Sequence, residues 1–193
     1  MFAHFANALR DGEVALIPAL TTHENPSPRP HRGPLRHPFA VAAPVAKLGN
    51  FELTDQEANK RTYRFPKTKV TVMTVADQKG ADQLAPWIQR VYDRFQNQID
   101  IDGVADVSMI PKLFQPILRE AFKKQLGYSV TLDWNGSVVK QFAYEKNVAN
   151  IYVIDRGGRI VKRLTGAVSN EALRALFRAI DAAIADAQQN DPA

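Results

Sequence analysis

The chain has 193 residues, of which 45% are hydrophobic and 23% charged, and its formal net charge at pH 7 is +5. A chain of this length can bury one hydrophobic core and still leave a tail, so we expect a single domain. It contains no cysteine, which excludes disulfides, thiolate metal sites and every mechanism that needs a thiol of its own.

Residues 1–46 differ in composition from the rest of the chain. The stretch from Asn25 to Pro38, NPSPRPHRGPLRHP, is rich in proline, arginine and histidine, and this composition disfavours both helix and sheet. We therefore predict a flexible tail with a weak helix at 2–10. The histidines of the tail lack the helical i, i+4 spacing of a metal site, so no metal is expected.

The sequence predicts neither export nor a membrane span. No apolar run approaches the ~20 residues that a membrane helix needs. The run FAVAAPVA, Phe39–Ala46, is short, is interrupted by Pro44 and lies late in the chain, unlike the apolar core of a signal peptide. We expect a soluble, cytoplasmic protein, with a periplasmic one as the alternative if the true start codon has been misassigned.

From Lys47 the chain follows an α/β pattern, in which β-branched runs indicate strands and apolar residues three or four positions apart indicate helices. In chain order, the sequence predicts a hairpin with strands at 50–55 and 62–65, a central strand at 70–75, a helix at 82–95, a strand at 99–107 and a helix at 110–126. A short strand at 130–136, a brief helical piece at 137–142, a hairpin at 150–166 that turns at Gly157 and Gly158, and a last helix capped by Ser169 follow. Right-handed crossovers then place the two early strands parallel in one sheet.

The helix predicted at 110–126 has a distinct apolar face. The residues expected to pack on the core are Leu113, Phe114, Ile117, Leu118 and Phe122. Arg119, Lys123 and Lys124 are expected to point into solvent, because basic residues on a helix more often form a wet face than a binding patch.

This order of elements resembles the thioredoxin-like superfamily, specifically its redoxin branch of alkyl hydroperoxide reductase-like and thiol-disulfide proteins. The resemblance rests on the segments LTDQEANKRTYRF, VTVMTV, VTLDWNGSVVKQF and NIYVIDRGGRIVKRLTG. It implies an α/β three-layer sandwich, with a mixed central sheet flanked by helices and a redoxin-type insertion. It covers 47–187, with a disordered C-terminus expected at 188–193.

In that family the loop after the first core strand holds the reactive cysteines. If the strand ends are aligned, Lys79 and Asp82 occupy the two cysteine positions; if the helix prolines are aligned at Pro86, Gln78 and Ala81 occupy them. Neither register supplies a thiol, so dithiol exchange and cysteine peroxidase chemistry are excluded for this chain alone.

Two further departures from the family pattern concern the same site. The family's cis-proline is replaced by Val148 and Ala149, and a cis bond without proline would cost about 2.5 to 4 kcal/mol. The strand at 70–75 also carries no buried acid. The resemblance therefore implies that the fold is kept while the redox function is absent.

The loop Gln78–Asp82, with Ala149 beside it, is the candidate binding site, and it has two interpretations. Lys79 and the helix amides could bind a carboxylate or phosphate, with Gly80 letting the backbone come close. Alternatively, Asp82 caps the helix, Gly80 makes a turn and Lys79 is solvated. Asp100, Asp102 and Asp106 alternate along one strand and could hold a hard cation, although ion pairing is the simpler interpretation.

The function expected is a non-redox binding or interaction module, whose partner is an unknown protein or a small anionic ligand. No nucleic acid is expected as a partner, because no stripe of basic residues interleaved with aromatic ones occurs in the sequence. No catalytic residue and no cofactor is predicted, because all four histidines lie in the tail and no Ser-His-Asp set can form. Two enzyme classes stay open as alternatives: a redoxin relative that uses a partner's thiol, and an enzyme acting on an anionic molecule at the helix N-terminus. A homodimer is also open.

Overall fold

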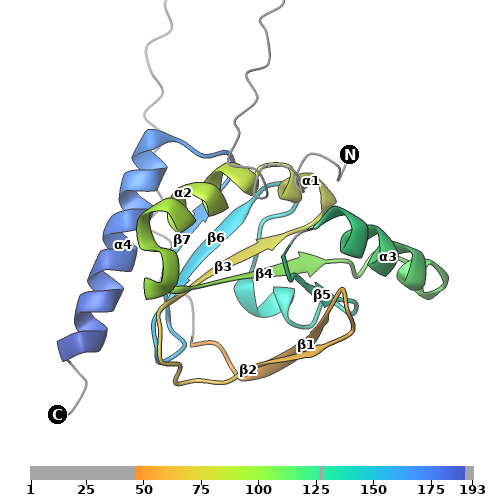
Figure 1. Ribbon diagram of the computed structural model, residues 1–193, viewed down its shortest axis with the longest axis horizontal. Coiled ribbons are helices and arrows are strands. Elements are labelled where there is room, and N and C mark those ends of the chain that lie inside the picture. The colour runs from red at the N-terminus through yellow and green to blue at the C-terminus, as the bar shows by residue number, and fades with distance from the viewer. Residues whose placement is uncertain (1–46, 127, 190–193) are drawn as a thin grey trace, which may run out of the picture.

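The computed structural model describes residues 47–126 and 128–189, so the predicted tail and its weak helix lie outside the described residues (Figure 1). The first half contains β1 (Phe51–Asp55), β2 (Lys60–Tyr63), β3 (Thr71–Ala76), α1 (Gln78–Ala81), α2 (Ala85–Phe95), η2 (Gln96–Gln98) and β4 (Asp100–Asp106). The second half contains η3 (Lys112–Phe114), α3 (Gln115–Gln125), β5 (Thr131–Asp133), η4 (Val139–Phe142), β6 (Asn150–Ile154), β7 (Ile160–Thr165) and α4 (Asn170–Gln189).

The strands form one mixed sheet of seven strands in the order β2-β1-β5-β4-β3-β6-β7. β4 lies parallel to both β3 and β5, whereas the hairpins β1–β2 and β6–β7 are antiparallel. Every residue of β3 is buried, as a central strand with both faces covered requires. The parallel pair and both predicted hairpins are confirmed.

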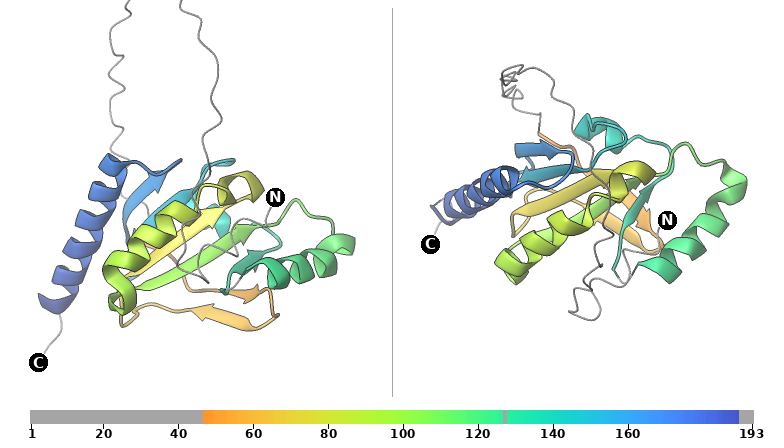
Figure 2. Two further views of the ribbon diagram at one scale, coloured as in Figure 1. Left: turned by 45° about the horizontal axis from the view of Figure 1, so that its top comes forward. Right: turned by 90° about the horizontal axis from the view of Figure 1, so that it is seen from above.

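The helices α2, α3 and α4 cover one face of the sheet, and η4 covers the other (Figure 2). On the helical face, Trp87, Val91 and Phe95 of α2 pack with Leu176 and Ile180 of α4 over β3 and β6. The opposite face buries Phe142 of η4 among residues of β1, β3 and β6. The predicted layers, including the insertion, are therefore confirmed.

The chain between β3 and β4 forms two α-helices, α1 and α2, followed by the short η2, instead of the single helix predicted at 82–95. Helix α1 begins at Gln78, and a turn at 82–84 separates it from α2. Trp87 is 1% exposed, and its indole Nε1 donates to the Gly166 carbonyl oxygen at 3.0 Å. This bond ties α2 to the segment between β7 and α4.

The single helix predicted at 110–126 is divided into η3 and α3, and the expected orientation is wrong for most of its apolar residues. Leu113 is 80% exposed, Ile117 67% and Phe114 50%, and only Leu118 and Phe122 pack against the sheet. The reason is that α3 lies over β5, a strand of three residues, which offers too little surface for so wide an apolar stripe.

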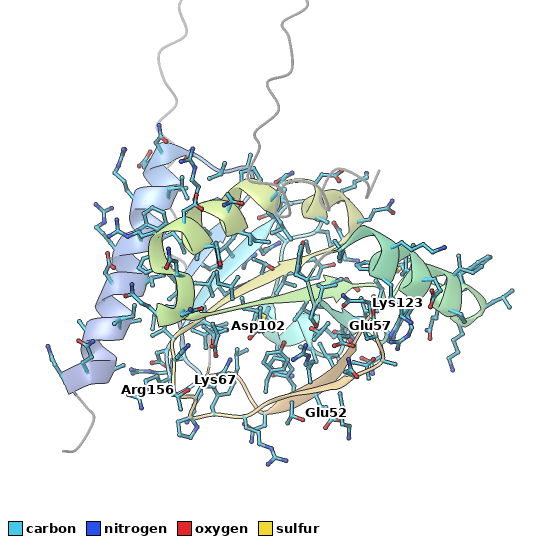
Figure 3. The ribbon with its side chains drawn as sticks, viewed as in Figure 1. Glu52, Glu57, Lys67, Asp102, Lys123 and Arg156 are labelled. Carbon is cyan, nitrogen blue, oxygen red and sulfur yellow. The ribbon has the colours of Figure 1, made fainter. Side chains whose placement is uncertain are left out.

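Arg119 also departs from its predicted place in solvent. Its guanidinium donates to the Asp55 carbonyl oxygen at 2.8 Å and to Thr54 Oγ1 at 3.1 Å, and it lies 5.3 Å from the centre of the Trp134 ring. Lys123 does point outward, where its Nζ lies 3.0 Å from Glu120 and 3.6 Å from Glu57 (Figure 3).

The C-terminal elements largely match the sequence predictions. The β6–β7 turn contains Gly158 at φ +88°, where a Cβ would lie 2.7 Å from the Phe65 ring, so glycine is required there. Ser169 caps α4, because its Oγ accepts a hydrogen bond from Ala172 N at 3.1 Å. The prediction of disorder from 188 is wrong for Gln188 and Gln189, which belong to α4. No helix in the described parts of the chain is long and apolar enough to cross a membrane.

Candidate functional site

Asp77 organises the loop that follows β3. Its carboxylate accepts hydrogen bonds from Gly80 N at 2.9 Å and from Asn147 N at 2.8 Å, so it caps α1 and links it to the segment before β6. The prediction that Asp82 caps the helix at 82–95 is wrong, since α2 begins at Ala85 with Leu84 at its N-cap position, and Asp82 stands at the C-terminal end of α1. The cap comes earlier because the helix begins directly after the strand.

Gly80 allows the loop to touch the segment that precedes β6. A Cβ at this position would lie 2.3 Å from the Val148 carbonyl oxygen, which is far inside van der Waals contact. Gly80 therefore sits inside α1 at a close approach and does not make the predicted turn. Ala149 is fully buried, and its N–H donates to Gln83 Oε1 at 3.3 Å.

The Val148–Ala149 bond is trans, since Phe65–Pro66 is the one cis peptide within 47–126 and 128–189. The sequence correctly predicts that this segment lies beside the loop, and the segment does not have the cis peptide bond that is usual there in the proteins that the sequence resembles.

The side chains of the loop divide into two groups. Lys79 and Asp82 are exposed, whereas Ala81 and the likewise exposed Gln78 line a cavity. The Gly80 amide, which an anion would need, already donates to Asp77. The geometry therefore gives the anion-binding interpretation no free amide at this position.

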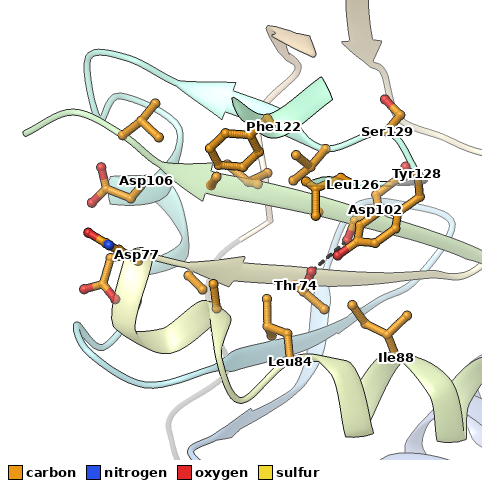
Figure 4. Close-up of a pocket in the computed structure, with 18 of the residues that line it drawn as sticks. Thr74, Asp77, Leu84, Ile88, Asp102, Asp106, Phe122, Leu126, Tyr128 and Ser129 are labelled. Carbon is orange, nitrogen blue, oxygen red and sulfur yellow. Dashed lines mark hydrogen bonds between the residues drawn. The ribbon is translucent and has the colours of Figure 1, made fainter. Parts of the chain in front are cut away.

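The cavity lies between α2 and α3 on the helical face of the sheet and has a volume of about 220 Å³ (Figure 4). Its floor is made of small side chains, Thr74 and Ala76 from β3 with Gly103 and Ala105 from β4. Its apolar walls are formed by Leu84, Ile88, Leu118, Phe122, Leu126 and Val130.

Sequence reasoning missed this cavity. Its signal is the pair Gly103 and Ala105, two positions apart and therefore on one side of β4. A core strand usually carries large β-branched residues at such positions, so two small ones leave space beneath the helices.

Two carboxylates, those of Asp77 and Asp106, line the end of the cavity beside the loop (Figure 4), and the charges of both act on Tyr144. Asp106 accepts hydrogen bonds from Ser108 N at 3.0 Å and Ser108 Oγ at 2.6 Å, and the Tyr144 hydroxyl also donates to it. Burial acts to raise the pKa of Asp106, but these hydrogen bonds outweigh it and hold that pKa below its usual range. Asp106 is therefore ionised at neutral pH.

The other end of the cavity is formed by Asp102, Tyr128 and Ser129. Lys67 Nζ lies 2.8 Å from Asp100 and 3.4 Å from Asp102 (Figure 3). Burial raises the pKa of Asp102 despite this neighbouring cation, and burial raises the pKa of Tyr128 to about 12. Because Asp106 lies at the far end of β4, the three aspartates do not converge on one cation, and Asp100 and Asp102 are ion-paired.

Comparison with known proteins identifies the fold. No protein-family model and no curated protein matches the chain. Among solved structures, a putative thiol:disulfide interchange protein DsbE from Chlorobium tepidum superposes with a TM-score of 0.56 at 14% identity, over 74% of this chain and 98% of that one. StoA from Bacillus subtilis gives a TM-score of 0.53 at 15% identity, over 69% and 99%.

A putative thioredoxin from Neisseria meningitidis gives a TM-score of 0.53 at 20% identity, over 70% of this chain and 87% of that one. Similarity at this level concerns the backbone and carries no activity with it. The chain therefore has the thioredoxin-like fold that its element order predicted, and it has this fold without any cysteine.

Proposed function

We propose that this protein is a non-redox binding module that holds a small, mainly apolar molecule in the cavity between α2 and α3. The observation that carries the proposal is the cavity itself, with apolar walls over a floor of small residues and with Asp77, Gln78 and Ala81 of the loop in its lining. Cavities of about 150 Å³ lined by apolar side chains bind aromatic rings, so this one suits a ligand of one or two rings.

The charges at the loop end indicate the polar group of the ligand. Asp106 is ionised at neutral pH, and Asp77 lines the same end of the cavity (Figure 4). Partly buried carboxylates attract a cation and repel an anion. The ligand class supported best is therefore an aryl or branched alkyl amine, with its ammonium group between Asp77 and Asp106.

The test is a pair of probes that share one ring system and differ in charge. Calorimetric titration of the full chain with 2-naphthylmethylamine is expected to show saturable binding, and 2-naphthoate is expected to bind at least about tenfold more weakly. Ala105→Ile fills the floor of the cavity and should abolish binding of the amine. Ala167→Ile, in an exposed loop outside the cavity, serves as the matched control and should bind normally.

Two outcomes would overturn this proposal. Unchanged amine binding by Ala105→Ile would place the probe elsewhere on the protein. Preferential binding of 2-naphthoate that is lost in Lys79→Ala would instead support an anion site at the start of α1.

A further inference from the structure

An apolar surface projects from the start of α3, away from the cavity. In the described part of the chain, six large apolar side chains are exposed, and four of them fall within nine residues: Met109, Leu113, Phe114 and Ile117, exposed by 82%, 80%, 50% and 67%. We call these four residues the α3 tip. Helix α3 lies at the opposite end of the sheet from α4 (Figures 1 and 2), so the tip is at the edge of the molecule.

Hydrogen bonds and packing hold the tip in place. Ile110 N donates to the Val107 carbonyl oxygen at 3.0 Å, and Phe114 N donates to that of Pro111 at 2.9 Å. One turn further along, Leu118 and Phe122 pack on the sheet and the Arg119 guanidinium bonds to Asp55. The exposed side chains are therefore carried on an anchored helix.

Lys112, which is exposed, is the one charged residue in the sequence of the tip from Met109 to Ile117. The nearest acidic residues along the chain already have partners, since Asp106 accepts hydrogen bonds from Ser108 and Glu120 pairs with Lys123. A symmetric contact between two copies would bring their Lys112 ammonium groups toward one another, which is unfavourable. The positive charge of Lys112 is therefore better matched by an anionic partner than by a second copy of this chain.

The projecting shape of the tip favours one class of anionic partner. Side chains that are 80% exposed, such as Leu113, project from the surface, and none of the four lines the cavity between α2 and α3. Projecting apolar side chains next to a lysine can enter the interfacial region of a bilayer, while the ammonium group meets lipid phosphates. We infer that the α3 tip docks the protein onto an anionic lipid surface.

The experiment measures binding of the full chain to vesicles by co-sedimentation. Binding is expected to vesicles of phosphatidylcholine mixed with phosphatidylglycerol, and to be much weaker with phosphatidylcholine alone. The double variant Leu113→Ser/Ile117→Ser should weaken binding at least about tenfold, because two large apolar side chains no longer leave water. Val161→Ser, at an exposed apolar residue of β7, is the matched control and should bind as the wild type does.

A charge-reversed pair tests the lysine separately. Lys112→Glu should weaken binding to the anionic vesicles, whereas Lys140→Glu, at an exposed lysine of η4 on the opposite face, should have a smaller effect. Equal binding by the wild type and the double variant would overturn the inference, since lipid binding would then come from another part of the chain. It would also be overturned if vesicles did not bind and light scattering showed a dimer that the double variant dissociates, since the tip would then be a contact between copies.

Discussion

Gly80 is the residue at which two distant segments come closest, because a Cβ there would lie 2.3 Å from the Val148 carbonyl oxygen. We expect Gly80→Ala to lower the free energy of unfolding by about 1–3 kcal/mol, since backbone on both sides must move. Urea denaturation measures this value. In Gly49→Ala the new Cβ would meet only Gln141 Oε1, at 3.8 Å, so this control should stay within about 0.5 kcal/mol of the wild type. Equal stability of the two variants would contradict the close contact.

Asp106 gives a prediction that depends on pH. Its pKa is held below the usual range in the folded state, so its contribution to stability is present above the ordinary carboxyl pKa and is lost as the pH falls through the lowered value. Tyr144→Phe removes one hydrogen-bond donor, and we expect a loss of about 1 kcal/mol at neutral pH, because Asp106 is only partly buried. Below about pH 3 the difference from the wild type should shrink.

The measurement is guanidinium denaturation of the wild type and Tyr144→Phe across this pH range. The exposed Tyr92 supplies the control Tyr92→Phe, for which no pH-dependent loss is expected. A loss in Tyr144→Phe that is the same at every pH would show that the hydroxyl does not act through Asp106.

Local sequence patterns identify one helix cap of this protein and leave another ambiguous. Ser169 was correctly predicted as a helix cap, because it stands alone before a clear apolar repeat. At the loop, Asp77 and Asp82 are both suitable caps, and the choice depends on where β3 ends in three dimensions.

Helix α3 is the element whose packing differs most from the prediction. Periodicity correctly predicted a helix, but the area available to it depends on β5, whose three residues are set by its pairing with β1 and β4. The cavity has a similar origin, because it results from small side chains on β3 and β4 beneath two separate helices. The sequence of α3 does not show how much surface β5 offers to it, and the sequences of β3 and β4 do not show which helices lie above their small residues.

Arg119 is predicted to anchor α3 to the sheet. We expect Arg119→Ala to cost about 2 kcal/mol, since it removes the hydrogen bonds of a charged group to Asp55 and Thr54. Hydrogen exchange should show faster exchange of the α3 amides than in the wild type, with α4 unaffected. Lys124→Ala, at an exposed position of the same helix, should leave exchange unchanged, and equal protection of α3 in both variants would contradict the anchoring role.

At the scale of the whole molecule, the fold was accessible from the sequence because strand order, crossover handedness and hairpin turns each restrict the topology. The ligand cavity could not be predicted in the same way, because a cavity is a space between side chains and depends on how the elements pack.

The absence of cysteine is enough to predict that the chain has no thiol chemistry of its own. Insulin disulfide reduction by dithiothreitol should therefore proceed at the same rate with and without the protein, and an acceleration by the purified chain would show that it takes part in disulfide exchange.

The most direct test of the proposed binding function is an NMR titration of the ¹⁵N-labelled full chain with 2-naphthylmethylamine. We expect saturable shifts of amides around the cavity, at Leu84, Gly103 and Ala105, and their loss in Ala105→Ile. Shifts confined to other parts of the protein, or no saturable shift at all, would contradict a ligand site between α2 and α3.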